Sequence, residues 1–139
     1  ETLALFGQEW FEASVAKGPL SNPAYRQALA RGRRYARAQG IDALLRQHRL
    51  DAIVAPTGGP AGLIDPINGD GGTAPSATMP AAVAGYPHIT VPMGQVSGLP
   101  VGLSLFGGAW QDARLLALAG HFEQLTRHRK PPTYRVRSV

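Results

Sequence analysis

The segment AAVAGYPHITVPMG, residues 81–94, joins a run of small residues to a β-branched stretch that stands between two prolines. Proline lacks the backbone N–H that a sheet ladder uses, so we expect Pro87 and Pro92 to mark the two ends of a short strand. Gly94 then closes the segment. The pattern therefore predicts one buried strand over residues 88–91, preceded by a short helix of small residues.

The predicted strand has two chemically different faces, because successive side chains of a strand point to opposite sides of the sheet. Ile89 and Val91 fall on one face, whereas His88 and Thr90 fall on the other. One face is thus apolar and the other is polar.

Two further strands are predicted around this segment. Residues 94–98 form a glycine-bounded link to a strand over residues 100–106, and a hairpin is the simplest pairing of the two strands. Upstream, residues 52–55 are a short apolar run, which is typical of a strand covered on both faces. Residues 56–75 are rich in glycine and proline, and loops of this length in compact domains are usually binding loops or lids.

Helices are predicted on both sides of the strands. Asn22 is placed to cap a helix that begins at Pro23 and ends at Gly40, where glycine supplies a left-handed residue. Asp42 and Asp112 are placed to cap two more helices. The remaining two helices are expected over residues 2–17 and 78–85.

Apolar side chains recur at helical spacing in two of these helices, which predicts buried stripes that contribute to the core. In the helix after Asn22 the stripe consists of Tyr25, Leu29 and Ala36. In the helix after Asp112 it consists of Leu115, Leu118, Ala119, Phe122 and Leu125.

The composition indicates a single partial domain spanning residues 1–139. With 139 residues and 44% hydrophobic content, the chain can bury one ordinary core. Residues 1–50 are expected to be helical, residues 51–108 to hold the strands and the Gly/Pro-rich loops, and residues 109–139 to form a helix and a tail.

No apolar run approaches the roughly 20 residues of a membrane span, so we expect no membrane partner. The chain has no cysteine, which removes disulfides and thiol chemistry. It opens at Glu1 without a signal segment, so we expect a piece of a longer protein and favour a cytoplasmic location.

The net charge of +5 comes largely from two groups of basic side chains, which raise the question of a nucleic-acid partner. In residues 26–37 the arginines alternate with Ala, Leu and Tyr at helical spacing, as on the solvated side of an amphipathic helix. The second group lies in residues 127–137. No RNA- or DNA-binding motif accompanies them, so we expect no nucleic-acid partner. A non-catalytic binding or scaffold module with a basic surface is the alternative that stays open.

Catalytic and metal-binding patterns are weak. The four histidines lack zinc-binding spacing, so we expect no metal. A triad of Ser104, His88 and Asp112 can be written, but Ser104 lies within a predicted strand rather than in an exposed nucleophile elbow. We interpret this combination as chance, and rank an independent hydrolase that uses Ser104 and His88 last.

Four segments of the chain share their sequence, order and spacing with a known family. They are LDAIVAPT (residues 50–57), PAAVAGYPHITVPMG (80–94), GLPVGLSLFG (98–107) and DARLLALAGHFE (112–123). Together they resemble the C-terminal part of the amidase signature family over nearly the whole chain. The segment PAAVAGYPH, together with the segments FGQEWFE and INGDGG, most resembles the bacterial branch of the family that includes peptide amidases. The resemblance implies an α/β fold, namely the C-terminal half of the amidase-signature fold, with a mixed β-sheet covered by α-helices.

The resemblance also implies a reaction. Members of this family hydrolyse carboxamides with a serine nucleophile, a second serine in a cis peptide and a lysine that moves protons, without a metal or an organic cofactor. These groups belong to the family's earlier half, in a glycine- and serine-rich segment with no counterpart here, and Lys17 and Lys130 stand beside no such motif. The resemblance therefore implies no catalytic residue and no cofactor in this chain, which we expect to be an amidohydrolase fragment that is inactive alone.

Thr57, Gly58 and Gly59 are the candidate substrate-binding residues. They follow the strand predicted over residues 52–55, and clefts of α/β sheets form at strand ends. A plain structural turn, in which the threonine caps its own backbone, explains the same residues equally well.

The resemblance implies two partners, which are a small-molecule or peptide amide as substrate of the full-length enzyme and the catalytic N-terminal half. Because a sheet cut from its fold exposes apolar faces and edges, we expect the isolated fragment to form homo-oligomers.

Overall fold

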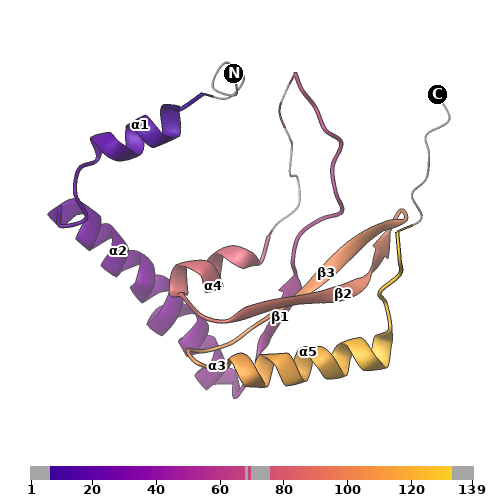
Figure 1. Cartoon of the computed structure of the whole chain (residues 1–139). Helices are drawn as coiled ribbons and strands as arrows, with labels where there is room; N and C mark the ends of the chain where they lie inside the picture. Colours follow the sequence, from indigo (N-terminus) through magenta and orange to yellow (C-terminus); the bar gives the residue numbers. More distant parts are fainter. Residues whose placement is uncertain (1–6, 68, 70–75, 133–139) are drawn as a thin grey trace.

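A three-stranded sheet between helices forms the body of the molecule, and α1 and α2 extend from it as an arm (Figure 1). The computed structural model describes residues 7–67, 69 and 76–132. The elements in chain order are α1 (Glu9–Ala16), α2 (Pro23–Ala36), η2 (Arg37–Ile41), α3 (Asp42–His48), β1 (Ile53–Pro56), α4 (Thr78–Ala84), β2 (His88–Val96), β3 (Leu99–Phe106) and α5 (Asp112–Thr126). This arrangement of helices around a sheet confirms the predicted fold class.

β3 is the central strand of the described sheet, because it pairs with β1 on one edge and with β2 on the other. Both pairs are antiparallel, and Ser104 lies opposite Ala55 in the first and opposite Thr90 in the second. β2 and β3 are joined by Ser97 and Gly98, whose φ values of 52° and 80° are both positive, as a tight hairpin turn requires. The predicted hairpin is therefore confirmed.

Pro92 lies inside β2, so the prediction that Pro87 and Pro92 bound a short strand is wrong at its second end. β2 continues to Val96. A register shift between Pro92 and Gly94 interrupts the ladder near the residue that cannot donate a hydrogen bond. β2 is also an outer strand of the described sheet, where a missing N–H is tolerated.

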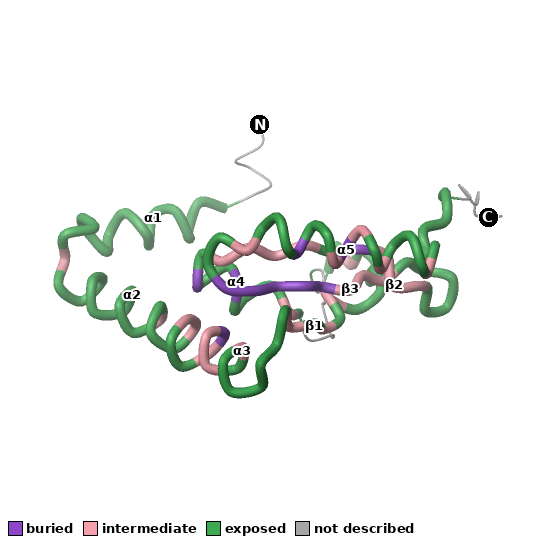
Figure 2. The backbone as a smooth tube through the Cα atoms, turned by 90° about the horizontal axis from the view of Figure 1, so that it is seen from below, coloured by how far each residue is buried: buried purple, intermediate pink, exposed green. Residues whose placement is uncertain are grey.

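One face of the sheet packs against α5. Val91 of β2 and Leu105 of β3 are buried together with Leu115 and Ala119 of α5, and the half-buried Ile89 packs beside them. The predicted apolar face of β2 is thus confirmed. Figure 2 shows that burial concentrates in β3, α4 and the sheet-facing side of α5.

The other face of the sheet packs against α4 and η2. Phe106 of β3 is buried with Ile41 of η2 and with Ala81 and Ala84 of α4. The alanines allow the α4 backbone to lie close to its neighbours, and Gly85 ends the helix with a φ of 66°, a conformation that favours glycine. The short helix predicted before the strand is therefore confirmed.

The helix predicted to end at Gly40 instead continues through a kink. Gly40 has φ −113° and ψ −106°, outside the left-handed region, and η2 joins α2 directly to α3. The kink places Ile41 in the core beside α4. It also places Arg37 beside α4, where the Arg37 Nε donates to the carbonyl of Ala84 at 2.6 Å. Packing against α4 thus outweighs the local stop signal.

One of the three predicted caps is confirmed. The Asn22 side-chain oxygen accepts a hydrogen bond from the N–H of Ala24 at 2.9 Å. Asp42 and Asp112 are instead the first residues of α3 and α5, and neither is the N-cap. Gln111 precedes α5, and its side chain accepts a hydrogen bond from the N–H of Gly108 at 3.1 Å.

Several side chains predicted to be buried are exposed in the described chain. α1 and most of α2 extend away from the sheet (Figure 2), so Tyr25 and Leu29 are 43% and 38% exposed. Leu125 lies in the last turn of α5 and is 85% exposed. Val54 of the outer strand β1, predicted to be covered on both faces, is 59% exposed.

Parts of three predicted segments lie outside the described residues. They are the beginning of the first helix (residues 2–6), residues 68 and 70–75 of the long loop, and the tail from residue 133 onward. Among the described residues, no helix combines the length and the apolar character needed to cross a bilayer.

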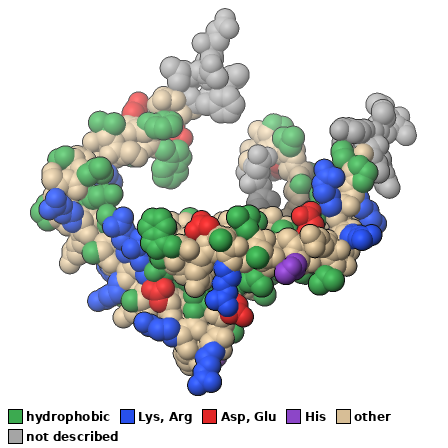
Figure 3. Space-filling view, turned by 60° about the horizontal axis from the view of Figure 1, so that its bottom comes forward, with side chains coloured by type: hydrophobic (Ala, Val, Ile, Leu, Met, Phe, Trp, Pro, Cys, Tyr) green, Lys and Arg blue, Asp and Glu red, His purple; other side chains and the backbone are tan. Residues whose placement is uncertain are grey.

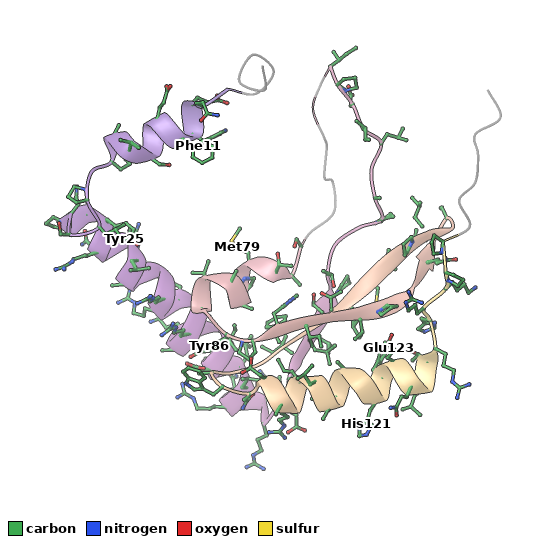
Figure 4. The ribbon with its side chains drawn as sticks, viewed as in Figure 1. Phe11, Tyr25, Met79, Tyr86, His121 and Glu123 are labelled. Atoms are coloured by element: carbon green, nitrogen blue, oxygen red, sulfur yellow. The ribbon has the colours of Figure 1, made fainter. Side chains whose placement is uncertain are left out.

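Tyr86 ties the connection between α4 and β2 to α3 (Figure 4). Its hydroxyl donates to the Asp42 carboxylate at 3.0 Å, and the Arg37 guanidinium lies 5.4 Å from the centre of its ring. Burial raises the pKa of Tyr86, the hydrogen bond and charge of Asp42 raise the pKa further, and the Arg37 charge lowers it in part.

Leu115→Ala and its neighbour Leu116→Ala test the α5 face. Leu115 is 2% exposed in the core, whereas Leu116 is 62% exposed. Removing a buried leucine side chain costs roughly 2–5 kcal/mol, whereas an exposed one costs at most about 0.5 kcal/mol. We expect Leu115→Ala to lower the midpoint of urea unfolding clearly and Leu116→Ala to leave it nearly unchanged. Equal losses would contradict the packing described for α5.

Tyr86→Phe tests the junction through its pH dependence. Because the folded-state pKa of Tyr86 lies above the unfolded value of about 10, the unfolded chain releases this proton first as the pH rises. The stabilisation is therefore complete below about pH 10 and is lost as the pH rises through the folded-state pKa.

We expect urea unfolding of the wild type to show a steeper loss of stability above about pH 10 than that of Tyr86→Phe. At neutral pH the variant should be less stable by about 1 kcal/mol, because the hydrogen bond to Asp42 is lost. Identical pH profiles for the two proteins would contradict this description of the junction.

Candidate functional site

The candidate site forms where β1 ends and the chain leaves the sheet. The N–H of Thr57 donates to the carbonyl of Gly102 in β3 at 2.8 Å, which continues the hydrogen bonding one residue beyond Pro56. The Thr57 carbonyl accepts from the N–H of Ala77 at 3.3 Å. The long loop therefore leaves and returns at one point of the sheet edge.

An open, mainly apolar pocket of about 410 Å³ lies beside this point. Two of the three predicted substrate-binding residues, Gly58 and Gly59, lie in its wall, together with Met93 of β2 and Val101 of β3. Thr57 does not line the pocket itself and stands between two residues that do, Pro56 and Gly58. An apolar concavity of this size fits an apolar group of a small ligand.

A chain of hydrogen-bonded side chains, here called the hydroxyl chain, consists of His88, Ser104, Thr57 and Thr90. The Ser104 hydroxyl donates to Thr57 Oγ1 at 2.8 Å, and the Thr57 hydroxyl donates to Thr90 Oγ1 at 3.2 Å. His88 Nε2 lies 2.8 Å from Ser104 Oγ. Ser104 is completely buried, whereas Thr57 and His88 are half-buried. The hydroxyl chain thus links β2 and β3 to the start of the long loop, directly after β1.

The interpretation of the Ser104, His88 and Asp112 triad as chance is confirmed in the described residues, although Ser104 and His88 do form one contact. This contact does not create a nucleophile, because Ser104 is 0% exposed and its proton is donated to Thr57 rather than to a base. Asp112 and His88 border one shallow pocket, but no hydrogen bond joins their side chains in the described part of the chain. The described residues therefore offer no serine triad.

Gly102 leaves the space that the hydroxyl chain occupies. A Cβ atom on Gly102 would lie 2.6 Å from Thr90 Cγ2 and 3.0 Å from Thr57 Oγ1. These distances are shorter than ordinary contacts, so any larger residue would push the two threonines apart.

Basic side chains lie at the surface of the molecule (Figure 3), and among the arginines of residues 26–37 only Arg37 is partly buried. The guanidinium of Arg34 lies 5.2 Å from the ring centre of Tyr35, and Arg37 is held by Ala84 and Tyr86. Arg37 also borders a pocket of about 410 Å³ with a mixed polar and apolar lining, together with the 94% exposed Trp110. The other arginines of residues 26–37, and the basic residues at 127, 129 and 130, are exposed as expected from the sequence.

No group of three or more His, Asp or Glu side chains that could hold a metal ion occurs among residues 7–67, 69 and 76–132.

Comparisons with known proteins agree with one another. A family model described as Amidase matches residues 12–116. The solved peptide amidase of Stenotrophomonas maltophilia has a TM-score of 0.83 and 47% identity over 96% of this chain, and the solved structure of PAM12A has 0.91 and 49% over 96%. A glutamyl-tRNA(Gln) amidotransferase protein from Symbiobacterium thermophilum is 33% identical over 68% of this chain.

The chain spans only part of each of these proteins. It covers 26% of the peptide amidase, 27% of PAM12A and 21% of the amidotransferase protein. It thus spans about a fifth of the length of the first curated relatives that it matches.

Gly102→Ala and Gly58→Ala test how closely the hydroxyl chain is packed. A Cβ on Gly102 meets Thr90 and Thr57, whereas a Cβ on Gly58 meets no heavy atom within 4 Å. Overpacking of this kind costs about 1–3 kcal/mol, whereas an open site changes stability by at most about 0.5 kcal/mol. We expect urea unfolding to show a clear loss for Gly102→Ala alone, and an equal loss for both variants would contradict the packing.

Proposed function

This chain belongs to the amidase family, and on that premise we propose that it is the C-terminal part of an amidohydrolase that cleaves the C–N bond of carboxamides. The observation that carries the proposal is the match of residues 12–116 to the family model, together with 47% identity to a peptide amidase over 96% of the chain. The proposed reaction is hydrolysis by a serine–cis-serine–lysine mechanism.

The catalytic groups are proposed to lie upstream of this chain. An acyl transfer needs an activated nucleophile and preorganised donors for the oxyanion. Among the described residues, the serine that touches a histidine is buried and gives its proton to Thr57. The chain covers 26% of the peptide amidase, which leaves room for these groups elsewhere in the whole protein. We therefore propose that residues 1–139 are inactive alone.

The role proposed for this chain is to form one wall of the substrate site. The apolar pocket beside Gly58 and Gly59 suits an apolar side chain, and Thr57 stands next to it with a polar hydroxyl. A peptide amide carries both an apolar side chain and polar amide groups. We therefore propose a peptide amide or a small carboxamide as the substrate, with Thr57, Gly58 and Gly59 in contact with it.

The other half of the enzyme is the first proposed partner. Trp10, Phe11 and Val15 on α1 are 79%, 70% and 81% exposed, and apolar surface of this kind is usually covered by protein. We propose that the catalytic half covers this surface in the whole protein, and that the isolated chain self-associates through it. No cofactor and no nucleic acid enter the proposed reaction, and a cytoplasmic location stays a prediction.

Ammonia release from a C-terminal peptide amide by the full-length protein tests the proposal. We expect turnover by the wild type, and a kcat/KM about tenfold lower for Thr57→Ala, because one hydrogen bond to the substrate is lost. Thr126→Ala is the matched control, because its hydroxyl donates to the Phe122 carbonyl at the end of α5.

Two results would contradict the proposal. Absence of amide hydrolysis by the full-length wild type, with salt-sensitive binding of RNA or DNA instead, would favour the basic binding module. Equal kcat/KM values for the wild type and Thr57→Ala would remove Thr57 from the substrate site.

A further inference from the structure

The hydroxyl chain has one direction, which determines where His88 carries a proton. The Ser104 proton is donated to Thr57, so Ser104 accepts in its 2.8 Å contact with His88. The His88 Nε2 atom therefore carries hydrogen. This donor is present both in the neutral Nε2–H tautomer and in the imidazolium, so the hydroxyl chain does not depend on protonation at Nδ1.

The proton and the two lone pairs of the Thr57 hydroxyl determine what this group can offer to a ligand. A hydroxyl has one proton and two lone pairs. The proton of Thr57 is donated to Thr90, and one lone pair accepts from Ser104. The second lone pair belongs to a half-buried side chain whose two chain neighbours, Pro56 and Gly58, line the apolar pocket. Thr57 therefore presents an acceptor, and no donor, to a molecule bound beside it.

The position of this acceptor is held from several sides. Gly102 leaves just enough room for the Thr57 hydroxyl, because a Cβ atom on residue 102 would lie only 3.0 Å from Thr57 Oγ1. The Thr57 backbone is hydrogen-bonded to Gly102 and to Ala77. Ser104 sits in a fully buried position, where a hydroxyl without a partner would be costly, so its bonds to Thr57 and His88 are retained.

We propose that His88 and Ser104 are positioning residues, which hold the Thr57 hydroxyl as an acceptor for a backbone N–H of the bound amide substrate. The inference rests on the amide hydrolysis proposed above and names the group that this wall of the site recognises. The enzyme then prefers a peptide amide that carries the N–H over the same molecule methylated at that nitrogen, because an N-methyl group leaves the acceptor without a partner.

The test compares two substrates in the full-length enzyme, N-acetyl-phenylalaninamide and its analogue methylated at the backbone nitrogen. We expect the wild type to prefer the N–H substrate by about tenfold in kcat/KM, chiefly through KM. Thr57→Val removes the acceptor and Ser104→Ala releases it, so both variants should lose most of this preference. The double variant should lose no more than Thr57→Val, because both changes act through one oxygen atom.

Matched variants separate positioning from stability. His88→Gln keeps a side-chain N–H donor and should keep the preference, whereas His88→Leu should lose it. Val91→Ala removes a buried side chain from the opposite, α5-facing side of the sheet. We expect Val91→Ala to lower the unfolding midpoint while it keeps the wild-type preference. His121→Leu, on the surface of α5 (Figure 4), should change neither quantity.

Two results of these kinetic measurements would overturn the inference. A Ser104→Ala variant that is destabilised but keeps the wild-type preference would overturn it, because Ser104 would then be structural only. A wild type that cleaves both substrates equally well would overturn the N–H assignment and leave amide hydrolysis standing.

If the wild type cleaves neither substrate, the proposed function fails instead. Nitrogen NMR of the imidazoles then decides the hydroxyl chain by itself. A protonated Nε2 of His88 whose signal shifts in Ser104→Ala would support the chain, and an unprotonated Nε2 would overturn it.

Discussion

The central position of β3, hydrogen-bonded to β1 on one edge and to β2 on the other, is the constraint on which the other features of this structure depend. Side chains of β3 alternate between two cores, so Leu105 packs against α5 while Phe106 packs against α4 and η2. The same alternation places Ser104 opposite both Ala55 and Thr90. A shift of one residue in the β1–β3 ladder would move Thr57 away from Ser104, and a shift of one residue in the β2–β3 ladder would exchange the polar and apolar faces of β2 relative to β3.

The hydroxyl chain is a polar line in a sheet that otherwise packs through apolar side chains. A buried hydroxyl contributes little net stability even when it is satisfied, and an aliphatic residue could fill the same position. Stability alone therefore does not account for a fully buried Ser104 that binds His88 and Thr57. The role proposed for this chain at the substrate wall would account for it, because Thr57 stands where β1 ends and where both ends of the long loop meet.

The sequence predicts the parts of this structure that depend on neighbouring residues. Alternation along residues 88–91 predicts the two faces of β2, the small residues before them predict the short helix α4, and the glycine-bounded link over residues 94–98 predicts the hairpin. Other features depend on contacts between distant segments. The stop signal at Gly40 is overridden because Ile41 packs beside α4. Pro92 is tolerated within β2 because that strand lies at an edge of the described sheet.

In the candidate site, too, some features follow from neighbouring residues and others depend on contacts between distant segments. Gly58 and Gly59 follow a predicted strand end, and the structure places both beside a pocket. The contact of His88 with Ser104 depends on the β2–β3 register, which the sequence alone does not specify, and Thr57 joins them from 47 positions away.

A structure of the complete protein with a non-hydrolysable peptide amide bound would test the central claim most directly. Our account predicts that the ligand's apolar side chain lies in the pocket beside Gly58 and that one of its N–H groups donates to Thr57 Oγ1. A pocket filled by the protein's own side chains, with the ligand bound away from Thr57, would contradict the account.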